Sequence, residues 1–178
     1  MVCYHSDAEN RIVFVNKAWD TFAVENGASE LLSTRITGKN LFEFVTGMEL
    51  QHLQELLLKR ARKSLQPLSV PFRGDAPDER RFMEMTITAK ADGAVEFVTR
   101  LTRQEKRASV DVMRPASERS SIYLMLCSWC NRGCLPEGHW VEVEEATRQL
   151  GLFNSDEPLP QLTHGICPSC ATKIKVLI

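Results

Sequence analysis

The sequence predicts an α+β protein, in which an antiparallel sheet with helices is followed by a small C-terminal module stabilised by zinc. Two observations lead to this prediction. A first strand and several helical segments precede three strands of alternating apolar and polar residues, which is typical of an antiparallel sheet with one buried face. Five of the six cysteines lie after residue 126, so the C-terminal part differs in composition from the rest of the chain.

The first strand is predicted at residues 11–15, Arg-Ile-Val-Phe-Val, which are mostly apolar and β-branched. Asn16 follows where the period becomes helical, and asparagine is a preferred N-cap because its side chain accepts a hydrogen bond from the first turn. The next apolar residues repeat at helical spacing: Trp19, Phe22 and Ala23. Gly27 ends this helix. Cys3 is expected to be a small, buried apolar residue in the first strand.

A longer helix is predicted after short helical segments at residues 31–32 and 41–45. Its apolar residues recur at helical spacing: Leu50, Leu53, Leu57, Ala61 and Leu65. Pro67 ends it. Three strands follow, at residues 68–72, 83–89 and 95–101, each with apolar residues at alternate positions. Asp92 and Gly93 form a typical hairpin turn between the last two strands.

The order of these elements resembles that of a PAS domain over residues 1–107. The resemblance depends on the segment from Asp7 to Asn16, on Gly38, on the Asp92-Gly93 hairpin, and on the spacing Asn16-x-x-Trp19-x-x-Phe22. It implies a five-stranded antiparallel sheet with helices on one face. Such domains act in signalling, and the space between helices and sheet holds haem, flavin or a small molecule, or is filled by side chains.

If a sensory cavity is present, the sequence places it between the helices and the inner face of the sheet. Two residues would line it on the helical side, Phe14 and Trp19. Four would line it on the sheet side, because residues at alternate positions of a strand share a face: Met83, Met85, Phe97 and Leu101. The alternative is that these residues simply fill a packed core.

The strongest site in the sequence is formed by two close cysteine pairs, Cys127-x-x-Cys130 and Cys167-x-x-Cys170. Four thiolates complete a tetrahedral shell around Zn²⁺ with no open position, which is typical of a structural rather than a catalytic site. His164 is an alternative ligand, and Cys134 another. The same thiols suit an iron–sulfur cluster or, as a single pair, a redox motif.

The region around these pairs forms the predicted module at residues 121–178. It begins with an apolar strand at residues 121–126 and has one apolar helical face: Trp140, Val143, Ala146, Thr147 and Leu150. The pattern Cys-x-x-Cys followed by His-Gly-Ile-Cys-Pro-x-Cys from His164 to Cys170 resembles a short cysteine-rich extension at the C-terminal end of bacterial PAS and receiver-type signalling proteins. Residues 108–120, which include Pro115 and Ser117, are predicted to be a linker.

A run of charged residues lies between the strands predicted at residues 68–72 and 83–89: Arg73, Asp75, Asp78, Arg80 and Arg81. We expect a solvated face there, and the alternative is a contact with an anion or a partner. The formal net charge is −1, which gives no electrostatic basis for binding nucleic acid. No apolar run is long enough to span a bilayer, and the polar N-terminus is unlike a signal peptide, so a cytoplasmic protein is expected.

These observations predict a non-catalytic signalling protein, in which a PAS-like domain senses a ligand or partner and is coupled to a structural zinc module. A homodimer and a signalling protein partner are expected. The second hypothesis is a redox- or metal-responsive switch, in which oxidation of the zinc-bound thiolates releases the metal. A small enzyme is the last alternative, because the sequence contains no recognisable set of nucleophile, base and orienting residue.

Overall fold

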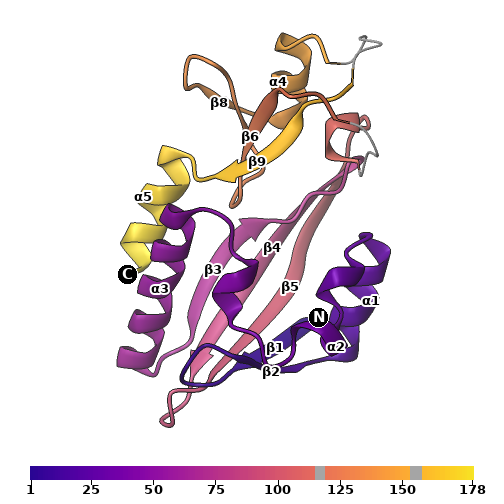
Figure 1. Ribbon diagram of the computed structural model, residues 1–178. Helices are drawn as coiled ribbons and strands as arrows, with labels where there is room; N and C mark the ends of the chain where they lie inside the picture. Colours follow the sequence, from indigo (N-terminus) through magenta and orange to yellow (C-terminus); the bar gives the residue numbers. More distant parts are fainter. Residues whose placement is uncertain (115–118, 153–157) are drawn as a thin grey trace.

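Two sheets form the framework of the computed structural model, which describes residues 1–114, 119–152 and 158–178 (Figure 1). The first sheet has five antiparallel strands in the order β2-β1-β5-β4-β3. The second has four strands in the order β8-β7-β6-β9. The predicted α+β class with a five-stranded antiparallel sheet is therefore confirmed. None of the described helices is both long and apolar enough to cross a bilayer.

The five-stranded sheet combines two strands from residues 2–15 with three strands from residues 68–106. Its strands are β1 (Val2–Ser6), β2 (Ile12–Val15), β3 (Leu68–Arg73), β4 (Glu79–Ala89) and β5 (Val95–Lys106). Five helical segments lie between β2 and β3: α1 (Lys17–Glu25), η1 (Ser29–Leu31), α2 (Ser33–Ile36), η2 (Leu41–Phe44) and α3 (Met48–Ser64). Strand β1 lies before the strand predicted at residues 11–15, and it pairs with β2 on one side and with β5 on the other.

The predicted helix caps and helical faces are largely confirmed. The side chain of Asn16 accepts a hydrogen bond from the backbone N–H of Trp19 at 3.1 Å, so it is the N-cap of α1. In α3 the predicted apolar residues up to Ala61 are buried. Leu65 is an exception, because it is the left-handed C-cap residue, with φ of 53°, and its side chain is 48% exposed.

An irregularity in β2 explains why Phe14 does not face the helices. Tyr4 pairs with Val15 and Ser6 pairs with Ile12, so one residue of β2 is extra between these pairs. The extra residue reverses the alternation of faces, as a β-bulge does. Ile12 is buried in the core, whereas Phe14 pairs with His5 and is 44% exposed on the opposite face. The expectation that Phe14 lines an internal cavity is wrong for this reason.

The second sheet is formed by the cysteine-rich part of the chain. Its strands are β6 (Tyr123–Cys127), β7 (Gly133–Cys134), β8 (Trp140–Val141) and β9 (Gln161–Gly165). Helix α4 (Val143–Gln149) precedes β9, and α5 (Pro168–Leu177) follows it. Strands β6 and β9 are parallel. Trp140, expected on the face of the short helix, lies in β8 instead, because α4 begins three residues later.

The segment predicted to be a linker contributes to a hydrophobic core. After β5, the short helix η3 (Asp111–Met113) carries Val112, which is buried together with Val110 against Leu124, Leu126 and Val143. The predicted linker residues Pro115 and Ser117 lie outside the described residues. The backbone carbonyl of Val112 also accepts a hydrogen bond from the Arg119 guanidinium at 3.0 Å.

The main hydrophobic core extends across the predicted boundary between the two parts. It includes residues of the first sheet and α3, such as Ile87 and Leu57, and residues of the cysteine-rich part, such as Trp129 and Ile174. Helices α3 and α5 lie side by side (Figure 1). The two predicted units, residues 1–107 and 121–178, are therefore packed together. Whether each of them folds independently stays a prediction.

Candidate metal centre and apolar groove

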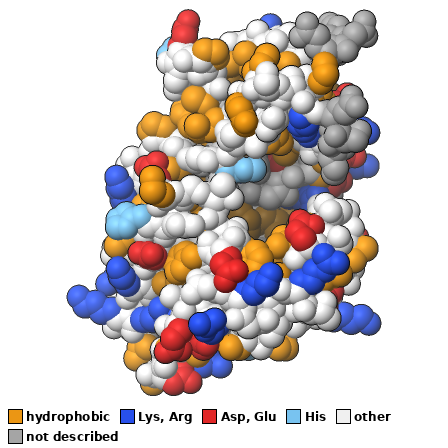
Figure 2. Space-filling model, viewed as in Figure 1, with side chains coloured by type: hydrophobic (Ala, Val, Ile, Leu, Met, Phe, Trp, Pro, Cys, Tyr) orange, Lys and Arg blue, Asp and Glu red, His pale blue; other side chains and the backbone are white. Residues whose placement is uncertain are grey.

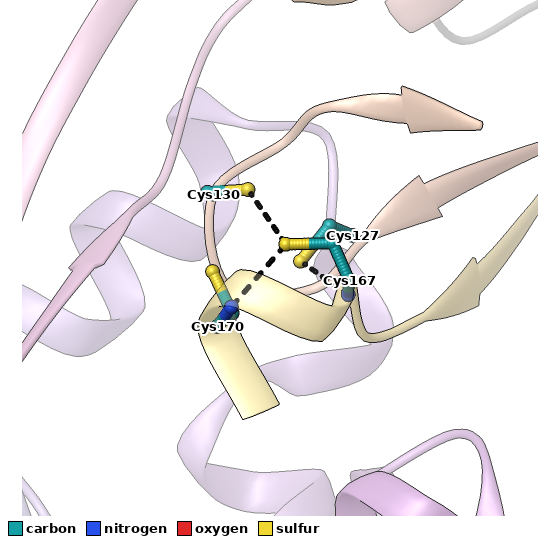
Figure 3. Close-up of side chains that lie close together, drawn as sticks. All are labelled: Cys127, Cys130, Cys167 and Cys170. Carbon is teal, nitrogen blue, oxygen red and sulfur yellow. Dashed lines mark hydrogen bonds between the residues drawn. The ribbon is translucent and has the colours of Figure 1, made fainter. Parts of the chain in front are cut away.

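Four cysteine thiols converge at the point where β6 ends and α5 begins (Figure 3). Cys127 is the last residue of β6, and Cys130 lies in the turn that follows. Cys167 is the N-cap of α5, and Cys170 lies in its first turn. The four sulfur atoms all lie within 4.8 Å of one another, and Cys127, Cys167 and Cys170 are buried. The four predicted metal ligands are therefore brought together.

Hydrogen bonds from backbone N–H groups position two of these thiols. The backbone N–H of Cys170 donates to Sγ of Cys167 at 3.4 Å, and the N–H of Cys167 donates to Sγ of Cys127 at 3.3 Å. Pro168 occupies the first turn of α5, where its missing N–H costs nothing. Backbone N–H groups at a helix N-terminus favour negative charge. The sequence Cys-Pro-x-Cys thus forms a turn that stabilises thiolates.

The spacing of the sulfur atoms fits one metal ion. A tetrahedral Zn²⁺ with Zn–S bonds of about 2.3 Å places its sulfur ligands about 3.8 Å apart. The sulfur atoms of Cys130 and Cys167 lie 3.8 Å apart. In a polynuclear iron–sulfur cluster the four thiolates are divided between two or four iron atoms, so thiolates on different iron atoms lie farther apart than around a single ion. The arrangement therefore suits a single metal ion such as zinc.

The electrostatics of the four thiols favour a cation. Hydrogen bonds from the thiols of Cys130 and Cys170 lower the pKa of Cys127 far below its ordinary value. The same contact with Cys127 raises the pKa of Cys170, because a second negative charge beside the first is unfavourable. A divalent cation removes this conflict by attracting all four thiolates.

The two alternative ligands lie outside this cluster. His164 is exposed and lies beside a shallow hollow formed with the segment before α3. The thiol of Cys134 donates to the backbone carbonyl of Leu135 at 3.5 Å. Neither residue belongs to the group of cysteines around Cys127.

The turn between Cys127 and Cys130 also attaches the metal centre to the edge of the first sheet. The indole N–H of Trp129 donates to the backbone carbonyl of Pro71 at 2.8 Å. The backbone N–H of Arg73 donates to the carbonyl of Trp129 at 2.8 Å. Because Pro71 and Arg73 belong to β3, the metal centre is fixed to the outer edge of that strand.

Part of the predicted charged loop is buried at this junction rather than solvated. The Asp75 side chain is 0% exposed and pairs with the guanidinium groups of Arg73 and Arg107. Arg73 also pairs with Glu142 at 2.7 Å, and Arg107 pairs with Glu144 at 3.0 Å. Burial raises the pKa of Glu142, but the pair with Arg73 outweighs it, so this pKa is lowered. The expectation of a solvated face is wrong here, because the loop contacts the N-terminal turn of α4.

An apolar groove of about 330 Å³ lies between α1 and the first sheet. Three of the residues predicted to line a cavity do line this groove: Trp19, Met83 and Met85. Phe97 lies deeper in the core, where its ring stacks on Tyr4 at 4.3 Å. Leu101 is 48% exposed, because β5 extends beyond the helices that cover the sheet. The predicted cavity residues thus divide between the groove, the core and the surface.

Other features of the centre had no signal in the sequence. The indole contact of Trp129 and the charged junction both depend on the approach of segments far apart in the chain, which local patterns do not report. Comparison with models of known protein families and with curated proteins finds no match for this chain.

On the face in Figure 2, the described Lys and Arg side chains are interspersed with Asp and Glu.

Proposed function

We propose that this chain is a non-catalytic signalling protein, in which a PAS-like sensor domain is coupled to a structural zinc module. The five-stranded antiparallel sheet, with α1 and α3 packed on one face, supports the resemblance to PAS domains. The apolar groove would be the sensory site, and its occupant a small apolar molecule. The four-cysteine centre would hold Zn²⁺ in a closed shell.

One observation carries this proposal: β3 borders both the groove and the metal centre. Phe72 lines the groove. The residues on either side of it, Pro71 and Arg73, make the backbone hydrogen bonds to Trp129. A shift of Phe72 that admits a ligand therefore moves the two backbone groups that attach the metal centre. Strand β3 would thus couple the apolar groove to the four-cysteine centre.

A non-enzymatic role is supported by the lining of the groove. Its described lining residues are apolar or neutral, and Tyr4 is the only one that carries an ionisable group. Burial raises the pKa of Tyr4 far above neutrality, so its hydroxyl stays protonated. A general acid or base needs a pKa near the working pH.

The test is to measure zinc release and ligand binding together. Native mass spectrometry of the protein, purified without added metal, reports zinc, any retained small molecule and the number of subunits. A fluorescent probe with apolar aromatic rings and one sulfonate group, anilinonaphthalene sulfonate, then serves as groove ligand. Zinc release to a chromogenic chelator is expected to change at least about twofold when the probe binds.

Two matched variants make this test specific. Thr99→Phe places a ring in the groove and is expected to abolish the effect of the probe on zinc release. Thr102→Phe lies on the same strand at an exposed position outside the groove and is expected to retain it. If the probe changes zinc release equally in both variants, the coupling through β3 is wrong.

We also propose that the protein forms a homodimer, contacts a signalling protein partner and resides in the cytoplasm. The edge strand β2 supports a dimer, because Val13 and Phe14 are 51% and 44% exposed there. Edge strands with exposed apolar residues favour pairing with another chain. Light scattering at high micromolar concentration would show a dimer, and a monomer would contradict this part of the proposal.

A thiol switch is the second candidate function. Cys130 is only half-buried, and its sulfur lies 3.8 Å from that of Cys167, so oxidation would join these residues with little movement. Exposure to hydrogen peroxide is then expected to release zinc and form a disulfide, which mass spectrometry detects. Zinc retention at physiological peroxide concentrations favours the structural role.

A further inference from the structure

A second group of metal-binding side chains lies on the opposite face of the first sheet, away from the helices. Cys3, His5 and Glu96 each offer one ligand atom, and these three atoms lie within 4.8 Å of one another. All three side chains are partly accessible to solvent. Cys3 was expected to be a buried apolar residue, but it faces this side of the sheet.

Regular strand pairing explains why the three side chains converge. Cys3 and His5 are two residues apart on β1, so they point to the same face. Glu96 is the direct cross-strand partner of His5 on β5. Strand β1 is held between β2 and β5, and the ring of Phe14 packs 4.8 Å from that of His5. The three donors are thus carried by a rigid part of the fold.

We propose that Cys3, His5 and Glu96 bind a second Zn²⁺ and leave its fourth position open. Thiolate, imidazole and carboxylate are all ordinary zinc ligands, and three protein ligands with one exchangeable position define an open site. The cysteine cluster, by contrast, supplies four ligands and excludes further ones. The second site therefore binds zinc more weakly, and its bound zinc exchanges with free zinc in solution.

The interatomic distances are close to those of a tetrahedral zinc site. With Zn–S of about 2.3 Å and Zn–N of about 2.0–2.1 Å, sulfur and nitrogen lie about 3.5 Å apart. Sγ of Cys3 lies 3.6 Å from Nε2 of His5. A carboxylate oxygen and a nitrogen lie about 3.3 Å apart around zinc. Oε2 of Glu96 lies 3.0 Å from the same Nε2, so a small outward movement of the carboxylate is needed.

The approach of Cys3 to the same nitrogen atom adds a third group to a His5–Glu96 pair that is itself at hydrogen-bond distance. Both Sγ of Cys3 and Oε2 of Glu96 approach Nε2 of His5, not its two different nitrogens. When Nε2 carries a proton, it donates a hydrogen bond to the Glu96 carboxylate, and Sγ of Cys3 is a second, more distant acceptor. If Nε2 carries a lone pair instead, the carboxylate oxygen is repelled. A cation between the three atoms is attracted to all of them.

Zinc stoichiometry tests this proposal. The tag-free, full-length protein is equilibrated with buffered free Zn²⁺ and its zinc content is measured by mass spectrometry of the element. We expect about two zinc per chain at saturation, of which a weak chelator removes one. Cys3→Ser and Glu96→Gln are each expected to bind about one, and circular dichroism checks that both remain folded.

Two control variants exclude zinc bound loosely at exposed groups. Glu84→Gln removes a carboxylate from the same sheet, and Cys134→Ser removes a thiol outside both cysteine-containing groups, so both should retain about two zinc. A wild-type protein that saturates at one zinc, with Cys3→Ser and Glu96→Gln still binding that one zinc, overturns the proposal. So does a second zinc that persists in Cys3→Ser and Glu96→Gln.

Thiol alkylation gives an independent measurement. Zinc is expected to slow the reaction of Cys3 with iodoacetamide by at least about tenfold and to leave Cys134 unaffected. An unchanged rate at Cys3 overturns the proposal. Failure of the four-cysteine centre is distinguishable, because zinc would then not slow alkylation of the half-buried Cys130, while protection of Cys3 remained.

Discussion

Neutralising Asp75 is the sharpest test of the junction between the five-stranded sheet and the cysteine-rich part. The Asp75 side chain is fully buried and accepts a hydrogen bond from Nε of Arg73 at 3.1 Å. It also lies 3.3 Å from the guanidinium of Arg107 and accepts the backbone N–H of Arg81 at 3.1 Å. Asp75→Asn keeps the shape of the side chain but removes its charge, and it turns an NH₂ group towards these donors.

The expected loss of stability follows from the partners that remain. Removing one member of a buried ion pair costs about 3–5 kcal/mol, because the other charge stays buried. Arg73 keeps Glu142 and Arg107 keeps Glu144, so we expect the lower end, about 3 kcal/mol. For a chain of this length, 1 kcal/mol lowers the melting temperature by about 2–4 °C. Asp75→Asn should therefore melt about 6–12 °C below wild type.

Thermal unfolding followed by circular dichroism in zinc-containing buffer measures this difference. Asp78→Asn is the matched control, because Asp78 lies in the same loop but is exposed, and a surface change costs within about 0.5 kcal/mol. Raising the salt concentration should change the difference little, since buried pairs are poorly screened. Equal melting temperatures for the two variants would refute the reasoning.

Three further predictions follow from the structure. Cys170→Ser is expected to lose the metal and also to weaken residues 1–107, because Trp129 and Ile174 belong to the main core; a protease-resistant 1–107 fragment as stable as the wild-type protein would contradict this. Trp129→Phe should lower the free energy of unfolding by about 1–2 kcal/mol through the lost indole hydrogen bond, measured by urea denaturation. Met85→Ala should cost about 2 kcal/mol and alter probe binding in the groove, whereas Met48→Ala, 88% exposed, should do neither.

Local signals in the sequence predicted the elements that depend on nearby residues. Asn16 indicated the start of α1, because an N-cap acts within one turn. The apolar spacing from Leu50 to Ala61 predicted the buried face of α3. The cysteine spacing predicted the four-cysteine cluster for the same reason, since each pair forms its own tight turn. Only the approach of the two pairs required the tertiary fold.

Features that depend on an irregularity or on distant segments could not be read in the same way. The bulge in β2 moves Phe14 to the opposite face, although the alternation in the sequence is undisturbed. Asp75 belongs to a charged stretch typical of a solvated loop, and only the approach of α4 buries it. The group formed by Cys3, His5 and Glu96 depends on the register between β1 and β5, which no local pattern specifies.

The position of the metal centre explains why a small module matters to the larger sheet. Strand β3 is an edge of the five-stranded sheet, and an edge strand exposes unpaired backbone groups that favour association with other chains. Two of these groups, on Pro71 and Arg73, are bonded to Trp129. Because Trp129 lies between Cys127 and Cys130, the geometry of the turn between these two candidate ligands positions the residue that covers this edge. A metal ion bound by the four cysteines would thus stabilise its own module and also protect the sheet beside it.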